Sequence, residues 1–365
     1  MRILYGVQGT GNGHISRCRL IAQSLQAAGA EVDYVFSGRE AAAYFDMQAF
    51  GDYRALPGLT FATRNGLIDL LATVGRSQPL RLLRDIRQLP VDDYDLIVSD
   101  FEPVTAWAAK RQKRVSLGIS HQASFQFGIP QRGNNLMARL TMQHFAPVHH
   151  AIGLHWYHFG YPILPPVIEN LKPTKESENI LVYLPFESPR AIFELLSRFK
   201  SNHFVCFHPQ FSVPVEQNNL IFLPLGRESF VDVLRGSRGV ICNAGFELAS
   251  EALMLGKRLL LKPLQGQFEQ ESNAMTLELM GLAHVMPQLD PGQVRHWLSS
   301  EKAGQVYYPD VAAALAEWLV GGRQISVSEL AKNLWRQVIF PEPVMDRIQE
   351  SGMGSDLSNG KLMQI

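Results

Sequence analysis

A glycine-rich segment ending in histidine is the first part of the sequence that could do chemistry. It contains Gly9, Gly11, Asn12, Gly13 and His14, and it lies between a strand-length apolar run and a helical pattern. Glycines let a backbone turn sharply and approach a ligand, and free amides at a helix start attract an anion. The helix dipole keeps a histidine there neutral, which suits a general base. The alternative is a histidine that caps the turn or lies in the core.

A second strand, turn and helix can be read in residues 239–251. The turn is Asn243, Ala244 and Gly245, and Glu247 and Glu251 follow it on one face of the expected helix. Amides at the start of that helix suit a diphosphate. A carboxylate one to two turns into the helix could then bridge the two hydroxyls of a ribose. The alternative is that both glutamates are solvated.

A polar loop, residues 262–274, joins the next expected strand and helix. It contains Gln267, Glu269 and Gln270, whose side chains offer both hydrogen-bond donors and acceptors. Such a mixture can recognise the hydroxyl groups of a sugar. Taken alone, the loop is equally compatible with a polar cap on a helix.

These candidates need a scaffold, and the sequence predicts one from alternating apolar runs and amphipathic segments. The first half alternates expected strands with expected helices at 15–28, 39–50, 67–88 and 104–110. The second half does the same, with helices near 191–199, 230–234, 246–255 and 272–280. Alternation of this kind is typical of a doubly wound parallel sheet, in which ligands bind at the carboxyl ends of the strands. The fold class is therefore α/β, with two Rossmann-like domains facing a cleft.

Proline-rich and polar residues near 161–177 interrupt the alternation and suggest a linker. The expected division is a first domain at 1–165, a linker at 166–178, a second domain at 179–322, a terminal helix at 323–342 that crosses back to the first domain, and a flexible tail at 343–365.

Composition excludes several classes of protein. The 365 residues are 46% hydrophobic and 19% charged, which argues against long disorder, and Lys plus Arg equals Asp plus Glu at 34 each, which argues against binding nucleic acid. Three cysteines without paired spacing fit a reducing compartment, and no segment is apolar enough for a signal peptide or membrane span. A cytoplasmic location follows as an expectation.

One basic stretch suggests that the protein could also associate with a membrane surface. Its arginines share a mostly apolar part of the first half: Arg64, Arg76, Arg81, Arg84 and Arg87. They could contact acidic membrane lipid. A solvated helix face with snorkelling arginines is the alternative.

Two common nucleotide motifs do not fit. A dinucleotide fingerprint would need glycine where His14 stands and an acidic residue after the second expected strand, where Ser37 and Gly38 occur. A phosphate-binding Walker loop is absent because no glycine run is followed by Gly-Lys-Ser or Gly-Lys-Thr.

The run from 242 to 274 resembles the nucleotide-sugar-binding stretch of two-domain glycosyltransferases of the GT-B fold. It is most similar to the branch that contains the lipid-linked N-acetylglucosamine transferase of peptidoglycan synthesis, and to a related group of predicted bacterial and archaeal glycosyltransferases. The residues that carry the resemblance occur in the family's order: Gly245, Glu251, Gly256, Lys257, Pro263, Gln267, Gln270, Asn273 and Ala274. The glycine-rich loop ending in His14 matches too. The family's turn often has Ser or Gly where this chain has Asn243 and Ala244.

The resemblance implies transfer of a sugar from a nucleotide-diphosphate donor, a UDP-sugar in the first instance, to an acceptor that could be lipid- or glycan-linked. It implies inversion at the anomeric carbon, with no cofactor and no metal site. His14 would be the base, the turn would meet the diphosphate, Glu251 the ribose, and Glu269 and Gln270 the sugar. Asp100 and His121 could line the acceptor side, or serve as helix cap and turn. A nucleotide-sugar epimerase and a catalytically silent binding protein are the alternatives.

Overall fold

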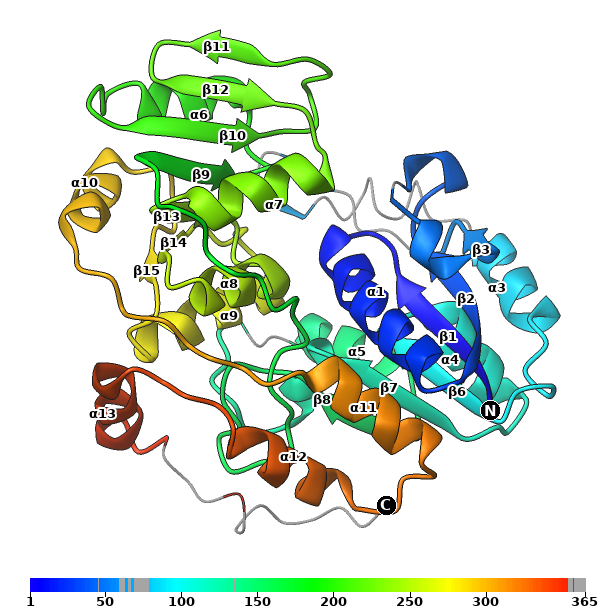
Figure 1. The fold of residues 1–365 in the computed structure, drawn as a ribbon. Coiled ribbons are helices and arrows are strands. Elements are labelled where there is room, and N and C mark those ends of the chain that lie inside the picture. Colours follow the sequence, from blue (N-terminus) through cyan, green and yellow to red (C-terminus); the bar gives the residue numbers. More distant parts are fainter. Residues whose placement is uncertain are drawn as a thin grey trace.

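The structure, a computed structural model, describes residues 1–44, 46–58, 63–64, 67–68, 79–133, 136–353 and 357. Two parallel β-sheets covered by helices form two lobes that face each other (Figure 1). We call the part built on the first sheet the N lobe and the part built on the second sheet the C lobe. The predicted fold class, two doubly wound α/β units, is confirmed.

The N lobe contains a six-stranded sheet in the order β3-β2-β1-β6-β7-β8, in which all neighbours are parallel. In the first strand of the chain, which is central in this sheet, residues 3–7 are buried because helices cover both faces of the sheet. The strands are β1 (Arg2–Gln8), β2 (Glu31–Ser37), β3 (Tyr53–Leu56), β6 (Leu96–Asp100), β7 (Ser116–Ser120) and β8 (His150–Gly153). The helices are α1 (Asn12–Ala27), α3 (Pro79–Gln88), α4 (Pro103–Arg111) and α5 (Leu136–His144). A hairpin and short 3-10 helices complete it: β4 (Thr63–Arg64), β5 (Leu67–Ile68), η1 (Ala41–Ala43), η2 (Gln48–Phe50) and η3 (Gln122–Gln126).

The C lobe contains a seven-stranded sheet in the order β11-β12-β10-β9-β13-β14-β15, parallel except at the edge strand β11. The strands are β9 (Asn179–Tyr183), β10 (His203–Phe207), β11 (Val215–Gln217), β12 (Leu220–Leu223), β13 (Gly239–Cys242), β14 (Arg258–Leu261) and β15 (His284–Val285). The helices are α6 (Pro189–Leu196), α7 (Arg227–Gly236), α8 (Phe246–Met254), α9 (Phe268–Leu279) and α10 (Pro291–Ser299).

The chain after the second sheet returns to the N lobe. Helix α11 (Val311–Val320) packs on α1, and α12 (Val327–Trp335) follows it along the base of the molecule (Figure 1). The indole Nε1 of Trp335 donates to the carbonyl oxygen of Ile163 at 2.6 Å, which ties α12 to the segment between the two sheets. The last helix, α13 (Glu342–Glu350), lies below the C lobe.

Three local predictions differ from the structure. Residues 39–50 form η1 and η2 rather than one helix, since Asp46 adopts a φ of 54°, which a right-handed helix does not allow. Of the helix predicted at 67–88, residues 79–88 form α3 and residues 67–68 form β5 instead, while 69–78 lie outside the described residues. The flexible tail is wrong at its start, because α13 buries Val344 and Ile348 on one face.

Candidate functional site

The predicted site residues lie where the carboxyl ends of the two sheets face each other. Asp100 is the last residue of β6, and His14 belongs to α1, which follows the adjacent strand β1. His121 directly follows β7. On the other side, α8 follows β13 after a turn of three residues and points its N-terminus toward α1. Parallel sheets place their ligand sites at this end, so both motif regions share one location.

His14 and Asp100 form a hydrogen-bonded pair. The Nδ1 atom of His14 lies 2.8 Å from Oδ1 of Asp100, whose side chain is fully buried, while the imidazole is 15% exposed. An ionised carboxylate can only accept a hydrogen bond, so Nδ1 donates and Nε2 keeps its lone pair. Nε2 lies 3.4 Å from the amide nitrogen of Gln122. The arrangement gives a histidine with one nitrogen held and the other available as a base.

Arg17 completes this pair, and the sequence analysis did not identify it. Its Nε donates to Oδ2 of Asp100 at 2.9 Å, and its Nη2 donates to Oδ1 at 2.7 Å. Burial alone would raise the pKa of Asp100, but Arg17 and His14 outweigh it and hold that pKa below the ordinary value. The spacing of Arg17, one helical turn after His14, was the signal that could have found it.

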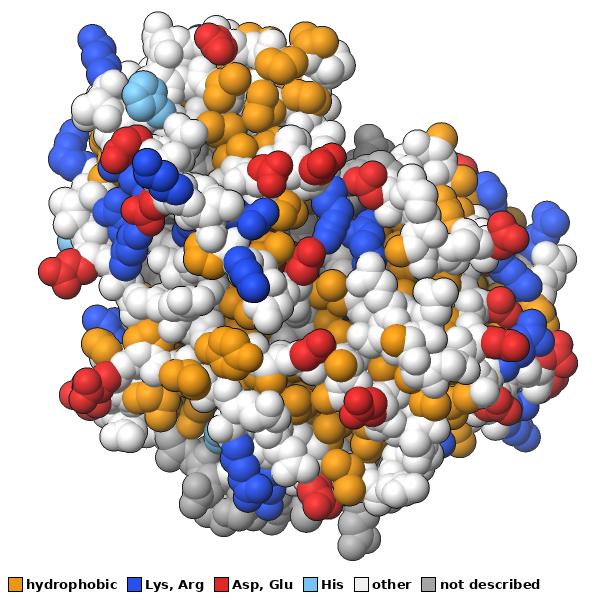
Figure 2. Space-filling model, viewed as in Figure 1, with side chains coloured by type: hydrophobic (Ala, Val, Ile, Leu, Met, Phe, Trp, Pro, Cys, Tyr) orange, Lys and Arg blue, Asp and Glu red, His pale blue; other side chains and the backbone are white. Residues whose placement is uncertain are grey.

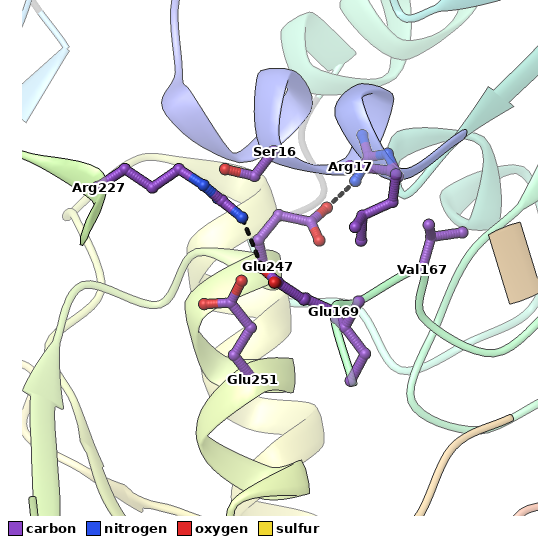
Figure 3. A pocket seen from close by; sticks show the side chains of 9 residues that line it. Ser16, Arg17, Val167, Glu169, Arg227, Glu247 and Glu251 are labelled. Carbon is purple, nitrogen blue, oxygen red and sulfur yellow. Dashed lines mark hydrogen bonds and ion pairs between the residues drawn. The ribbon is translucent and has the colours of Figure 1, made fainter. Parts of the chain in front are cut away.

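Glu247 faces the N lobe. Its carboxylate forms an ion pair with Nη1 of Arg17, and its side chain is 10% exposed (Figure 3). Burial raises the pKa of Glu247 to about 8, with Arg17 opposing the rise and Glu251, Asp100 and Glu269 adding to it. The alternative expectation, that this glutamate is solvated, is therefore wrong.

Glu251 lies one turn further along α8 and lines a small hollow between the lobes (Figure 3). Burial raises the pKa of Glu251 to about 7, against the opposing charge of Arg227. Arg227 on α7 in turn donates to Glu169 at 2.5 Å. The hollow is too small for a nucleotide, because the space between these side chains is only about 230 Å³ even with the open solvent at its mouth included. A nucleotide-sized ligand would require the surrounding groups to move apart.

The turn before α8 leaves the helix N-terminus open. Gly245 is the N-cap and no side chain caps the helix. A Cβ placed on Gly245 would meet nothing within 4 Å, so there is space in front of the first-turn amides. The other two turn residues are held by their neighbours: Asn243 donates to the carbonyl of Lys262 at 2.8 Å, and the carbonyl of Ala244 accepts from Asn273 at 3.0 Å.

The polar side chains of the loop before α9 and of its first turn have two different roles. Gln267 accepts from the backbone N–H of Gln270 at 2.5 Å, and Gln270 accepts from the backbone N–H of Leu264 at 3.0 Å. Both glutamines thus stabilise the loop and the start of the helix. Glu269 instead accepts from Gln122 of the N lobe at 2.9 Å.

His121 is buried at the junction of the lobes. Its Nε2 lies 2.7 Å from Oδ1 of Asn273, and its ring stacks on Phe246 at a centroid distance of 4.0 Å. With 1% of the residue exposed, His121 joins the lobes in this conformation rather than facing an acceptor. Asp100, fully buried behind His14, likewise acts on the imidazole rather than on an open surface.

The glycine-rich loop packs closely against other parts of the chain. A Cβ on Gly9 would lie 2.1 Å from the hydroxyl of Tyr44, and one on Gly13 would lie 2.9 Å from Cγ of Glu247. Gly11 is the N-cap of α1, and Asn12 accepts from Arg39 at 3.0 Å. Gly13 therefore allows α8 to approach the start of α1.

The carboxylates of the described residues do not gather into a metal site. The sequence contains an Asp-x-Asp triplet at Asp93–Asp95, but it precedes β6, at the opposite end of that strand from Asp100. Within the described ranges, no group of three or more His, Cys, Asp or Glu side chains has an arrangement that could bind a metal.

The sequence matches a known protein family over most of its length. A family model described as "Glycosyl transferase family 1" matches residues 1–300. The chain belongs to glycosyl transferase family 1. The family 1 assignment confirms the predicted resemblance to glycosyltransferases as a class of enzymes. No curated protein matches the sequence.

Solved structures similar to this family 1 chain share its fold. The glycotransferase of kitacinnamycin is 14% identical, with a TM-score of 0.55, 97% of this chain and 99% of that chain covered. Spinosyn rhamnosyltransferase SpnG is 12% identical, with a TM-score of 0.56 and coverages of 97% and 100%. UGT89C1 of Arabidopsis thaliana, solved in complex with UDP, is 12% identical, with a TM-score of 0.56 and coverages of 95% and 99%. These likenesses establish the two-lobed GT-B fold.

Proposed function

We propose that this protein transfers a sugar from a UDP-sugar to a hydroxyl group of an acceptor bound by the N lobe. The observation that carries the proposal is the pairing of His14 with Asp100 at 2.8 Å, opposite the open N-terminus of α8. The pair supplies a base, and the helix start supplies amides for a diphosphate. A neighbour in the fold was solved with UDP, which supports this nucleotide for the donor.

In the proposed reaction, Nε2 of His14 removes the proton of the acceptor hydroxyl as its oxygen attacks the anomeric carbon. The bond between that carbon and the diphosphate oxygen breaks, and UDP leaves with the electron pair. Attack on the face opposite the leaving group inverts the anomeric centre. The first-turn amides of α8 stabilise the charge that develops on the diphosphate, so this proposal requires no metal ion.

The donor-binding roles follow from position. Gly245 and the N-terminus of α8 would meet the diphosphate, and Glu251 would accept hydrogen bonds from the ribose hydroxyls in the hollow between the lobes. Glu269 would contact the sugar after releasing Gln122. Because the hollow is small, donor binding would be accompanied by a change in how the lobes meet.

We further propose that the acceptor is lipid-linked, as in the branch that the sequence resembles. Helix α3 supports contact with acidic lipid, because Arg81, Arg84 and Arg87 are exposed on it beside Leu80, which is 82% exposed. Arg76 lies outside the described residues, as does the side chain of Arg64. No helix in the described part of the chain has the length and apolar character needed to cross a bilayer.

A panel of nucleotides and nucleotide sugars tests the donor. Thermal unfolding of the purified protein should shift upward with UDP and with at least one UDP-sugar, because ligands that bind the folded state stabilise it. The proposal fails if neither UDP nor any UDP-sugar shifts the transition. Conversion of a UDP-sugar without an acceptor to its isomer would instead indicate an epimerase, and binding without turnover on any extract would indicate a silent protein.

A further inference from the structure

A continuous path of side-chain contacts runs from the C lobe to His14, and Arg17 is at its centre. Nη1 of Arg17 pairs with Glu247 of the C lobe, and Nε and Nη2 bind Asp100. Asp100 accepts from His14 at 2.8 Å. The path therefore connects the first turn of α8, where we place the donor, with the proposed base. Figure 3 shows its first step, the pair of Arg17 and Glu247.

Burial makes Asp100 depend on Arg17. Asp100 is fully buried and Arg17 is 2% exposed. A carboxylate without a countercharge in such surroundings takes up a proton, and a protonated Asp100 could no longer serve as a pure acceptor for His14. Arg17 supplies the countercharge, and with His14 it holds the pKa of Asp100 below the ordinary value despite the burial.

The geometry of the guanidinium also fixes the direction of the carboxylate. Arg17 contacts both oxygens of Asp100, at 2.9 and 2.7 Å, which is the paired arrangement that a planar guanidinium allows and an ammonium does not. The bonds hold Oδ1 toward Nδ1 of His14. Although Nη2 of Arg17 also lies 3.0 Å from Nδ1, both groups are donors when Nδ1 is protonated, so the hydrogen bond of the imidazole goes to Asp100.

We propose that Arg17 is a positioning residue: it orients Asp100 so that His14 keeps its proton on Nδ1, and it takes its own position from Glu247 of the C lobe. The identity of His14 as the base rests on the proposed function, whereas the role of Arg17 rests on these contacts. His14 then carries its proton on Nδ1 when the C lobe contacts the N lobe through Glu247 and Arg17. Contact between the lobes would thereby prepare the base where the donor binds.

The tautomer of His14 tests this role without any substrate. Long-range proton–nitrogen NMR spectra of the full chain, labelled with ¹⁵N-histidine, distinguish Nδ1–H from Nε2–H. The His14→Gln variant identifies which signals belong to His14. We expect the Nδ1–H form in the wild type. Arg17→Gln should shift the ratio of the tautomers toward Nε2–H by about tenfold or more, as expected for loss of a charge-assisted hydrogen bond. Arg17→Lys keeps the charge but not the two paired N–H donors of the guanidinium, so it should give an intermediate ratio of tautomers.

Two matched variants separate positioning from general loss of structure. Arg19→Gln removes another buried arginine of α1, one that donates to the carbonyl of Asp46, and should leave the tautomer ratio unchanged. Glu247→Gln should change the ratio in the same direction as Arg17→Gln but by less, whereas Glu278→Gln, at an exposed position of the C lobe, should not change it.

A wild-type tautomer ratio and wild-type His14 chemical shifts in Arg17→Gln would overturn the proposal. If that variant does not fold, wild-type spectra of Arg17→Lys and Glu247→Gln would overturn it equally. Thermal protection of the wild type by UDP is measured on the same samples. Its absence would contradict the proposed function while the tautomer ratios still decide the role of Arg17.

Discussion

At the scale of single residues, the proposed chemistry depends on a histidine that has one nitrogen occupied and one free. Asp100 occupies Nδ1 from 86 positions away in the chain, and His14 itself lies in the first turn of α1. Within the part of the chain that the structure describes, Nε2 lies 3.4 Å from the amide nitrogen of Gln122. An acceptor hydroxyl could replace that amide because the contact is weak at this distance.

Replacement of His14 should separate chemistry from donor binding. His14→Gln should lower turnover of the donor by about 10²–10⁴-fold, which is the usual contribution of a positioned base. UDP affinity should change little, since the imidazole meets the acceptor rather than the nucleotide. UDP release and calorimetric UDP binding measure the two effects. His296→Gln, at an exposed histidine of α10, is the control. Full turnover by His14→Gln would exclude it as the base.

Replacement of Glu251 should weaken recognition of the ribose. Glu251→Gln should reduce UDP affinity about 10–100-fold, because hydrogen bonds to a charged acceptor are lost. The wild type should bind UDP more tightly than 2′-deoxy-UDP, and Glu251→Gln should lose most of this difference. Glu278→Gln, at an exposed position of α9, should retain it. Equal discrimination by Glu251→Gln and wild type would place the ribose elsewhere.

At the scale of elements, the N-terminal ends of two helices, α1 and α8, provide most of the proposed site. Both α1 and α8 follow a buried parallel strand, and both begin at a glycine N-cap without a capping side chain. The two helix starts face each other, and Gly13 permits the approach because a Cβ there would meet Glu247. The remaining first-turn amides are therefore directed into the space between the lobes.

Helix α3 gives a prediction about partners. Replacing Arg81, Arg84 and Arg87 together with glutamine should weaken binding to vesicles rich in acidic lipid about 100-fold, given roughly 1 kcal/mol for each basic residue near such a surface. Sedimentation with acidic and with neutral vesicles measures this. Replacing Arg190, an exposed arginine of the C lobe, should have little effect. Equal sedimentation of wild-type protein with both kinds of vesicle would indicate a solvated helix face instead.

At the scale of the whole molecule, the lobes are held together by specific polar and aromatic contacts. Besides the Arg17–Glu247 pair, Gln122 bonds Glu269, and the indole of Trp156 donates to Ser250 at 2.8 Å. Acidic and basic side chains also mix on the surface over the junction of α7 and α1 (Figure 2). Glu269 is also a proposed donor-binding residue, so binding of the donor sugar would compete with its contact to Gln122.

The buried glutamates predict how stability depends on pH. Their pKa values rise from 4.5 to about 8 for Glu247 and about 7 for Glu251. The folded state then binds more protons than the unfolded state between these limits, so the free energy of unfolding should fall as pH rises from about 5 to 8. Glu247→Gln should reduce this fall by at least about 1 kcal/mol. Urea unfolding at several pH values measures it.

The exposed Glu278→Gln variant serves again as the control, because an exposed carboxylate contributes little to this slope. A wild-type slope in Glu247→Gln would show that the carboxylate of Glu247 ionises alike in the folded and unfolded states.

The sequence alone determined the two α/β sheets and the positions of the glycine-rich loop, His14 and the turn before α8. These features depend on apolar periodicity and glycine placement, which act over a few neighbouring residues. The same local reasoning failed at residues 39–50, where packing of Tyr44 and Phe50 against Phe36 replaces a helix.

Only the tertiary structure decided which polar side chains meet. Arg17 and Glu247 lie 230 positions apart, and no local pattern indicates that one neutralises the other. Gln267 and Gln270 matched a sugar-binding motif, yet the structure uses both for the backbone of their own loop. A polar side chain has the same identity as a cap, an interlobe contact or a ligand-binding group. Its role depends on the partner brought to it by segments distant in sequence, and packing of the two lobes determines that partner.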